Sequence, residues 1–80
     1  MEIKILGTGC AKCKQVKRLV AEVVSELHLD AQIIEVTDVP SILAYGVMST
    51  PGIVINEQVV GYGGVPNKAQ MMELVRQSNH

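Results

Sequence analysis

The sequence predicts an α/β fold in which strands and helices follow the order βαβαββα and form one four-stranded mixed sheet with helices on both faces. Three observations lead to this prediction. A short apolar run at residues 3–6 ends at a glycine, apolar residues between Val16 and Leu27 recur at helical spacing, and Asn56-Glu57 separates two runs rich in Ile and Val. The first two features, with a strand after them, predict a right-handed parallel crossover, and the third predicts an antiparallel hairpin.

The first half of the chain is expected to contain a strand, a long helix and a second strand. Residues 3–6 enter the turn at 7–9, whose two glycines break the strand. Projecting the helical periodicity backwards places Cys10 at the N-terminal edge of the helix and Cys13 in or near its first turn. Residues 31–36 are rich in Ile and Val and therefore predict the second strand.

The second half is expected to contain a short helix, a hairpin and a last helix. The N-cap chemistry of Thr37-Asp38 and an early Pro40 predict a helix over 39–45 that Gly46 ends. The hairpin joins 53–55 to 58–61, with its turn type left open. Apolar residues at helical spacing predict the last helix, and the chain end is expected to be frayed: Ala69, Met71, Met72, Leu74, Val75, and then Ser78-Asn79-His80.

Length and composition limit the classes of function. We expect residues 1–80 to form a single domain, because 80 residues cannot supply two adequate cores. A net charge of -1 without a basic cluster beside aromatic residues argues against nucleic acid as a partner. The N-terminus lacks the pattern of a secretory signal and no apolar run reaches the roughly 20 residues of a membrane span. We therefore expect a cytoplasmic protein with no membrane partner.

Cys10-Ala11-Lys12-Cys13 is the segment that predicts chemistry. A disulfide between these two residues would close too short a loop to stabilise the fold, so a redox role is favoured. The thiolate is the nucleophile in disulfide exchange, and a helix N-terminus stabilises it. Lys12 and Lys14 are expected to add electrostatic support. We expect Cys10 to be the exposed nucleophile and Cys13 the inner, resolving cysteine, and the two to form a disulfide during turnover.

Metal binding is the main alternative for the same thiols. Two cysteines supply half of a tetrahedral zinc site, and His28 and His80 lack the spacing of further ligands, so no metal site is predicted. A cluster shared between two subunits, or copper(I) held by two thiolates, stays open as an alternative. A redox sensor or adaptor on the same scaffold is the other alternative.

The chain resembles the thioredoxin superfamily in its element order, its size and the place of its cysteines. Residues 7–14 (GTGCAKCK) and 49–55 (STPGIVI) resemble the small thioredoxin- or glutaredoxin-like redox-active disulfide proteins of archaea and bacteria. The resemblance covers nearly the whole chain and implies a thioredoxin-like fold. It also implies that the Thr50–Pro51 bond is cis and that Thr50 and Pro51 bind substrate opposite the cysteines.

The chain departs from the superfamily at two informative positions. Thioredoxins carry a buried acid six positions ahead of the first cysteine, where this chain has Lys4, so another group or water must accept the Cys13 proton. Glutaredoxins place an acid where this chain has Asn67, which argues against glutathione as the substrate.

The resemblance thus implies a thiol–disulfide oxidoreductase that reduces protein disulfides by dithiol exchange through Cys10 and Cys13. We expect disulfide-containing proteins as substrates, and a thioredoxin-reductase-like flavoprotein or a small thiol as the reductant. No bound cofactor is expected, and the protein is expected to be a monomer.

Overall fold

The computed structural model describes residues 1–78, and the predicted order of strands and helices is confirmed. The α/β fold is also as predicted, with one four-stranded mixed sheet. The elements are β1 (Glu2–Leu6), α1 (Ala11–Glu26), β2 (Gln32–Val36), α2 (Val39–Ala44), β3 (Gly52–Ile55), β4 (Gln58–Tyr62) and α3 (Lys68–Ser78).

The four strands lie in the order β2-β1-β3-β4, so β1 is an inner strand. β1 pairs in parallel with β2, with Ile5 opposite Glu35, and antiparallel with β3, with Lys4 opposite Val54. β3 and β4 form the predicted hairpin. Because the chain leaves β1 at an inner position, the loop that follows it is held between the ends of neighbouring strands.

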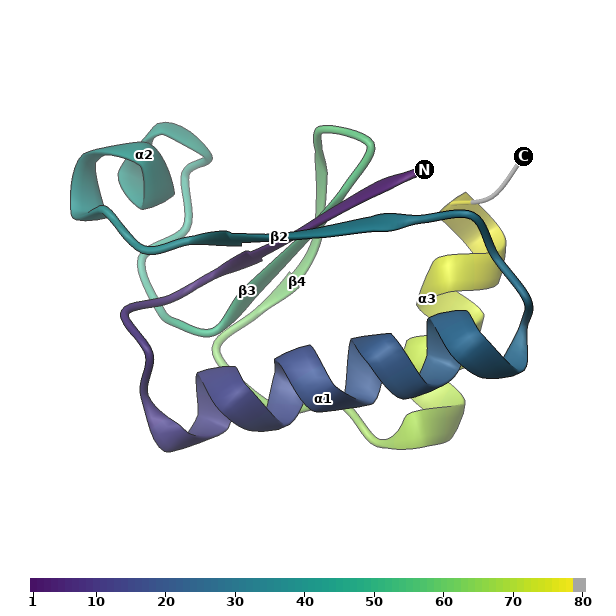
Figure 1. Cartoon of the computed structure of the whole chain (residues 1–80). Helices are drawn as coiled ribbons and strands as arrows, with labels where there is room; N and C mark the ends of the chain where they lie inside the picture. The colour runs from purple at the N-terminus through teal and green to yellow at the C-terminus, as the bar shows by residue number, and fades with distance from the viewer. Residues whose placement is uncertain (79–80) are drawn as a thin grey trace.

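Alternation along the strands divides the buried side chains between the two faces of the sheet. Figure 1 shows α1 and α3 on one face and α2 on the other. The core on the α1/α3 face consists of Ile3, Ile5, Val16, Val20, Val23, Ile53, Ile55, Met71 and Val75. The core on the α2 face is smaller and consists of Leu6, Ile42, Val47 and Val54. The long helix that begins at the cysteines is therefore fixed by the larger core.

Local side-chain chemistry sets the helix ends. The Asp38 carboxylate accepts from the Ser41 backbone N–H at 3.1 Å at the start of α2, and Gly46 adopts a φ of 77° after its end. Asn67 and Gln70 bond reciprocally to each other's backbone N–H groups at the start of α3, which is a capping box.

Two details refine the predictions from sequence. Asn56 and Glu57 have φ angles of 50° and 67°, so the hairpin turn that the sequence left open is of the I′ type. The expectation of a frayed end was wrong for Ser78, which is the last residue of α3 and donates its hydroxyl to the Leu74 carbonyl at 2.9 Å. Asn79 and His80 lie outside the described residues.

Candidate functional site

The two cysteines lie where β1 passes into α1. Gly9, with a φ of 89°, turns the chain, and Cys10 then takes the N-cap position with extended backbone. Its sulfur accepts a hydrogen bond from the Cys13 backbone N–H, with N and Sγ 3.3 Å apart. Cys10 is exposed, Cys13 is buried, and both are free thiols. The sulfur thus replaces the oxygen that normally caps a helix, and it meets the unpaired N–H groups of the first turn.

Gly7 provides the space in which Cys13 lies. A Cβ atom at this position would be 2.3 Å from Cys13 Sγ and 3.2 Å from Cys13 Cβ. Any side chain at residue 7 would therefore displace the inner sulfur from the end of β1. The sequence pattern indicates Gly7 only as a strand breaker, because the contact with Cys13 joins two elements whose packing the pattern does not specify.

Thr50 and Pro51 lie on the other side of the same spot. The Thr50–Pro51 peptide bond is cis. Thr50 Cβ is 3.9 Å from the point where a Gly7 Cβ would be, which brings Thr50 close to Cys13. Pro51 is buried, its carbonyl accepts from the Gly63 N–H at 2.9 Å, and Thr50 is exposed. The exposed surface beside the cysteines therefore includes Thr50.

The two sulfurs have shifted pKa values of opposite sign. The pKa of Cys10 is lowered, first by hydrogen bonding from the Cys13 thiol and then by the Cys13 backbone N–H. The pKa of Cys13 is raised, first by burial and then by hydrogen bonding to Cys10. Of the two sulfurs, the exposed one is therefore the more easily ionised.

A cavity of about 230 Å³ adjoins Cys13. It is lined by Ile5, Gly7, Gly9, Cys13, Lys14, Glu35 and Thr37. Glu35 reaches it from the neighbouring strand β2, because Glu35 pairs with Ile5 and shares the α1 face of the sheet. The volume is ample for several water molecules. The polar residues Lys14, Glu35 and Thr37 thus line the same cavity as the buried thiol, a grouping that the sequence pattern did not indicate.

Lys12 and Lys14, the residues expected to give electrostatic support, are both exposed in the first turn of α1. The hydrogen bonds described above account for the direction of the Cys10 shift, so the contribution of the two lysines stays a prediction.

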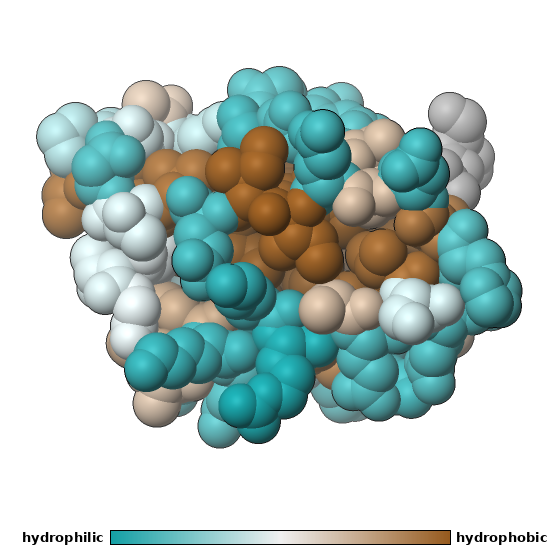
Figure 2. Space-filling view, in the orientation of Figure 1, coloured by the Kyte–Doolittle hydropathy of each residue, from teal (hydrophilic) through white to brown (hydrophobic). Residues whose placement is uncertain are grey.

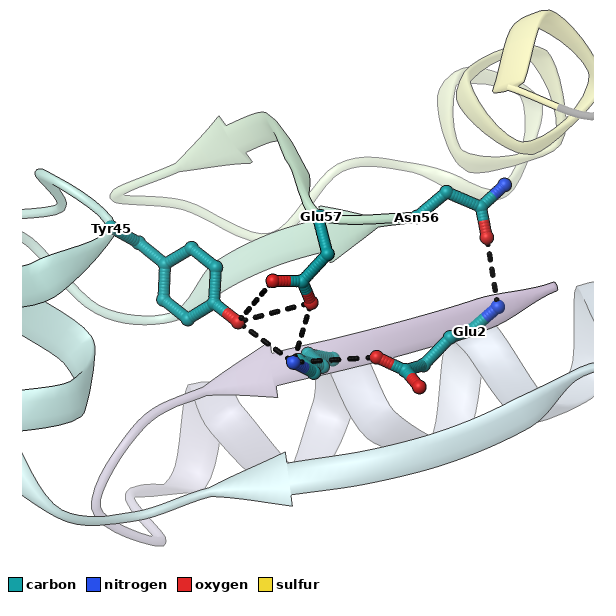
Figure 3. A network of polar contacts seen from close by, with 5 residues as sticks. Glu2, Tyr45, Asn56 and Glu57 are labelled. Atoms are coloured by element: carbon teal, nitrogen blue, oxygen red, sulfur yellow. Dashed lines mark hydrogen bonds and ion pairs between the residues drawn. The ribbon is translucent and has the colours of Figure 1, made fainter.

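Lys4 lies on the other face of the sheet from the cysteines. Its amine donates to the Tyr45 hydroxyl at 2.8 Å and to a Glu57 carboxylate oxygen, and it forms an ion pair with Glu2 at 3.3 Å. Figure 3 shows Tyr45, Glu57 and Glu2 converging on this amine. A cavity of about 590 Å³ opens beside the cluster and contains no cysteine among its lining residues. Of these two cavities, only the smaller one therefore adjoins a thiol.

Two negative findings concern the part of the chain that the structure describes. Within residues 1–78, no three His, Cys, Asp or Glu side chains are grouped so as to hold a metal ion. No helix in the same range combines the length and apolar character that crossing a membrane requires.

The chain matches a known protein family and named relatives. The family described as thioredoxin domain matches residues 1–76. A thioredoxin of Methanocaldococcus jannaschii is 41% identical over 71 residues, which cover 89% of this chain and 81% of that protein. A thioredoxin of Methanothermobacter thermautotrophicus is 31% identical over 75 residues, which cover 94% of this chain and 97% of that protein.

The fold has a counterpart among solved structures. Thioredoxin 1 from the thermophilic eubacterium Thermosipho africanus superimposes with a TM-score of 0.64 at 17% identity, over 96% of this chain and 92% of that one. This likeness concerns the fold, whereas the two archaeal relatives and the matched family extend to the sequence. With its paired thiols at the start of α1, the chain belongs to the thioredoxin family and is a thiol–disulfide oxidoreductase.

Proposed function

We propose that Cys10 and Cys13 carry out the oxidoreductase activity on protein disulfides, with Cys10 as the attacking thiolate and Cys13 as the resolving cysteine. The observation that carries this assignment is the difference between the two sulfurs. Cys10 is exposed at the N-cap with a lowered pKa, and Cys13 is buried with a raised pKa. The exposed sulfur can meet a large substrate, and the buried one is reserved for an intramolecular step.

In the first step the Cys10 thiolate attacks one sulfur of the substrate disulfide. A bond forms between Cys10 Sγ and that sulfur, the substrate S–S bond breaks, and the second substrate sulfur leaves as a thiolate that takes a proton from water. Lys12 and Lys14 favour the anionic state of Cys10 electrostatically. The product is a mixed disulfide between protein and substrate.

In the second step Cys13 releases its proton and attacks Cys10 Sγ. The Cys10–Cys13 disulfide forms, the mixed disulfide breaks, and the remaining substrate sulfur leaves as a thiolate. Thioredoxins have a buried acid at the position of Lys4, and this chain lacks it. The cavity beside Cys13 supports a route by which the Cys13 proton passes to water instead. The substrate gains two electrons and the protein loses two. A thioredoxin-reductase-like flavoprotein or a small thiol supplies two electrons to restore the dithiol.

Thr50 and Pro51 are proposed to hold the substrate beside Cys10. Thr50 is exposed and lies next to the cysteines, so its backbone groups are available to an extended substrate segment. Pairing with backbone gives affinity that depends little on substrate sequence. This position suits a protein that acts on the disulfides of more than one partner.

Reduction of insulin by dithiothreitol, followed with and without the protein, tests the assignment. We expect Cys10→Ser to abolish the acceleration. Cys13→Ser, incubated with insulin in the absence of dithiothreitol, should instead accumulate a mixed disulfide through Cys10 that mass spectrometry detects. The exposed, neighbouring Ser49→Ala serves as a matched surface control and should retain the acceleration. The assignment would be contradicted if Cys10→Ser still accelerated insulin reduction. It would also be contradicted if the wild-type protein formed its mixed disulfide with the substrate through Cys13.

A further inference from the structure

Three basic residues lie on the same side of α1 as the exposed Cys10. Lys14, Lys17 and Arg18 follow Cys10 by four, seven and eight residues, which is the spacing of one helix face. All three are exposed. Lys17 also pairs with Glu35 of β2 at 3.2 Å. We name Lys14, Lys17 and Arg18 the basic stripe. Figure 2 shows hydrophilic side chains over the region that α1 occupies in Figure 1.

The positive charge of the chain is concentrated in the first half of α1. Four of the seven Lys and Arg residues lie within positions 12–18, together with none of the eight acidic residues. The second half of the helix carries Glu22 and Glu26, and both are bound to Lys68, at 3.0 and 2.7 Å. A protein with a net charge of -1 therefore presents a positive surface beside its exposed sulfur.

Helix stability does not account for this distribution. Acidic side chains stabilise a helix N-terminus and basic ones a C-terminus, because of the unpaired backbone groups and the helix dipole. Within residues 11–26, α1 has no acid in its first turn and no basic residue in its last. The first-turn lysines therefore oppose the stability of the helix that carries them.

Stabilisation of the Cys10 thiolate accounts for only part of the stripe. Arg18 is eight residues from Cys10, a rise of roughly 12 Å along the helix axis. This separation exceeds the Debye length of about 8 Å at physiological salt, so Arg18 has little influence on the ionisation of the exposed sulfur. The stripe therefore extends beyond the reacting atoms along the exposed side of α1.

We propose that the basic stripe docks an acidic segment of the substrate, so that the favoured substrates are protein disulfides flanked on one side by Asp or Glu side chains. This inference rests on the proposed function and adds a substrate class to it. Carboxylates would pair with Lys14 and Arg18 while the disulfide lies at Cys10. Charge complementarity of this kind raises the rate of encounter and fixes the orientation of the partner.

Two peptides with the same disulfide test the proposal, one flanked on one side by three Glu residues and the other by three Lys residues. The measured quantity is the ratio of their kcat/KM values, because it cancels any common change in cysteine reactivity. We expect wild type to prefer the acidic peptide by roughly fivefold at 0.1 M salt, and by less than about twofold at 1 M, where the Debye length falls to roughly 3 Å.

Charge reversal then locates the preference on the molecule. Arg18→Glu should reduce the ratio at 0.1 M salt by roughly threefold, and Arg18→Gln should give an intermediate ratio. Arg76→Glu makes the same change in net charge in the last turn of α3, toward the opposite end of the molecule from the start of α1 (Figure 1), and should leave the ratio at its wild-type value.

The outcomes of these measurements distinguish failure of the docking proposal from failure of the proposed function. Equal ratios for Arg18→Glu and Arg76→Glu, or a wild-type ratio that does not respond to salt, would overturn the docking proposal while leaving the thiol chemistry intact. Failure of the proposed function gives a different result, because neither peptide would then be reduced faster by wild type than by Cys10→Ser.

Discussion

The two faces of the sheet differ in how completely they are covered. On the α1/α3 face, nine buried side chains form one continuous core, and the cysteines lie at the end of the helix that this core fixes. On the α2 face, only four buried side chains form the core, one of them Ile42 of the six-residue helix α2 itself, and a cavity of about 590 Å³ opens on this face. The two cysteines thus lie on the well-packed face, where Cys13 packs closely against Gly7.

The less covered face is held by polar contacts. Lys4 of β1, Tyr45 at the end of α2 and Glu57 in the hairpin turn meet at one amine, and Asn56 accepts from the Glu2 backbone N–H at 3.0 Å (Figure 3). These groups are partly or fully exposed. Exposed ion pairs contribute little to stability. The comparison therefore predicts that substitutions on the α1/α3 face affect both stability and turnover, and that substitutions on the α2 face affect stability alone.

Truncation of one buried side chain on each face should give the largest effect. Met71→Ala removes a fully buried side chain from the larger core and should reduce the free energy of unfolding by about 2–5 kcal/mol. Ile42→Ala on the α2 face should fall at the lower end of this range, because Ile42 packs in a core of only four buried side chains, which can relax into the space more easily. Urea unfolding of both variants measures the difference. A larger loss for Ile42→Ala would contradict the comparison.

Gly7→Ala tests the link between the larger core and the chemistry. The new Cβ would lie 2.3 Å from Cys13 Sγ, so the inner sulfur or the strand must move. We expect a loss of about 1–3 kcal/mol in the free energy of unfolding, the usual cost of overpacking. Formation of the Cys10–Cys13 disulfide should slow at least roughly tenfold, since about 1.4 kcal/mol in the barrier has that effect.

Gly64→Ala is the matched control for Gly7→Ala. A Cβ at Gly64 would meet no described atom within 4 Å, so stability and oxidation rate should both stay near wild type. Equal oxidation rates in the two alanine variants would show that the position of the Cys13 side chain does not depend on Gly7.

The smallest expected effect concerns the polar cluster on the α2 face. Hydrogen bonding to Lys4 lowers the pKa of Glu57 in the folded state. A lowered pKa means that the contribution to stability is present above the unfolded value, about 4.3, and is lost as the pH falls through the folded value. Glu57→Gln should therefore lower the Tm slightly at pH 7 and leave it unchanged at pH 2, with turnover unaffected. A Tm difference that persists at pH 2 would indicate a cause other than this ion pair.

The sequence predicted the parts of the fold that depend on short-range pattern. The periodicity from Val16 to Leu27 and the Ile- and Val-rich runs identified α1 and the strands, and Gly46 marked the end of α2. It failed at Ser78, because the bond from its hydroxyl to Leu74 extends α3 in a way that apolar spacing does not reveal. The I′ turn depends on two positive φ angles that Asn-Glu indicates only weakly.

In the candidate site too, the features set by short-range pattern were predicted and those set by contacts between distant elements were not. Cys10, Cys13 and their placement on the helix followed from spacing alone. The contact between Gly7 and Cys13 and the approach of Glu35 to the cavity join elements that are distant in the chain, and they depend on strand register. Lys4 was recognised as a departure from the superfamily, but its partners Tyr45 and Glu57 are 41 and 53 residues away.

Alkylation of the reduced protein with iodoacetamide across a range of pH, with mass spectrometry to locate the label, tests the difference between the two sulfurs most directly. The expected result is that Cys10 reacts first, with an apparent pKa below the value of about 8.5 for free cysteine. Cys13 should react only at higher pH. If Cys10 titrated at or above the free value, or if both sulfurs were labelled together, the N-cap would not activate the nucleophile and the assignment of roles would fail.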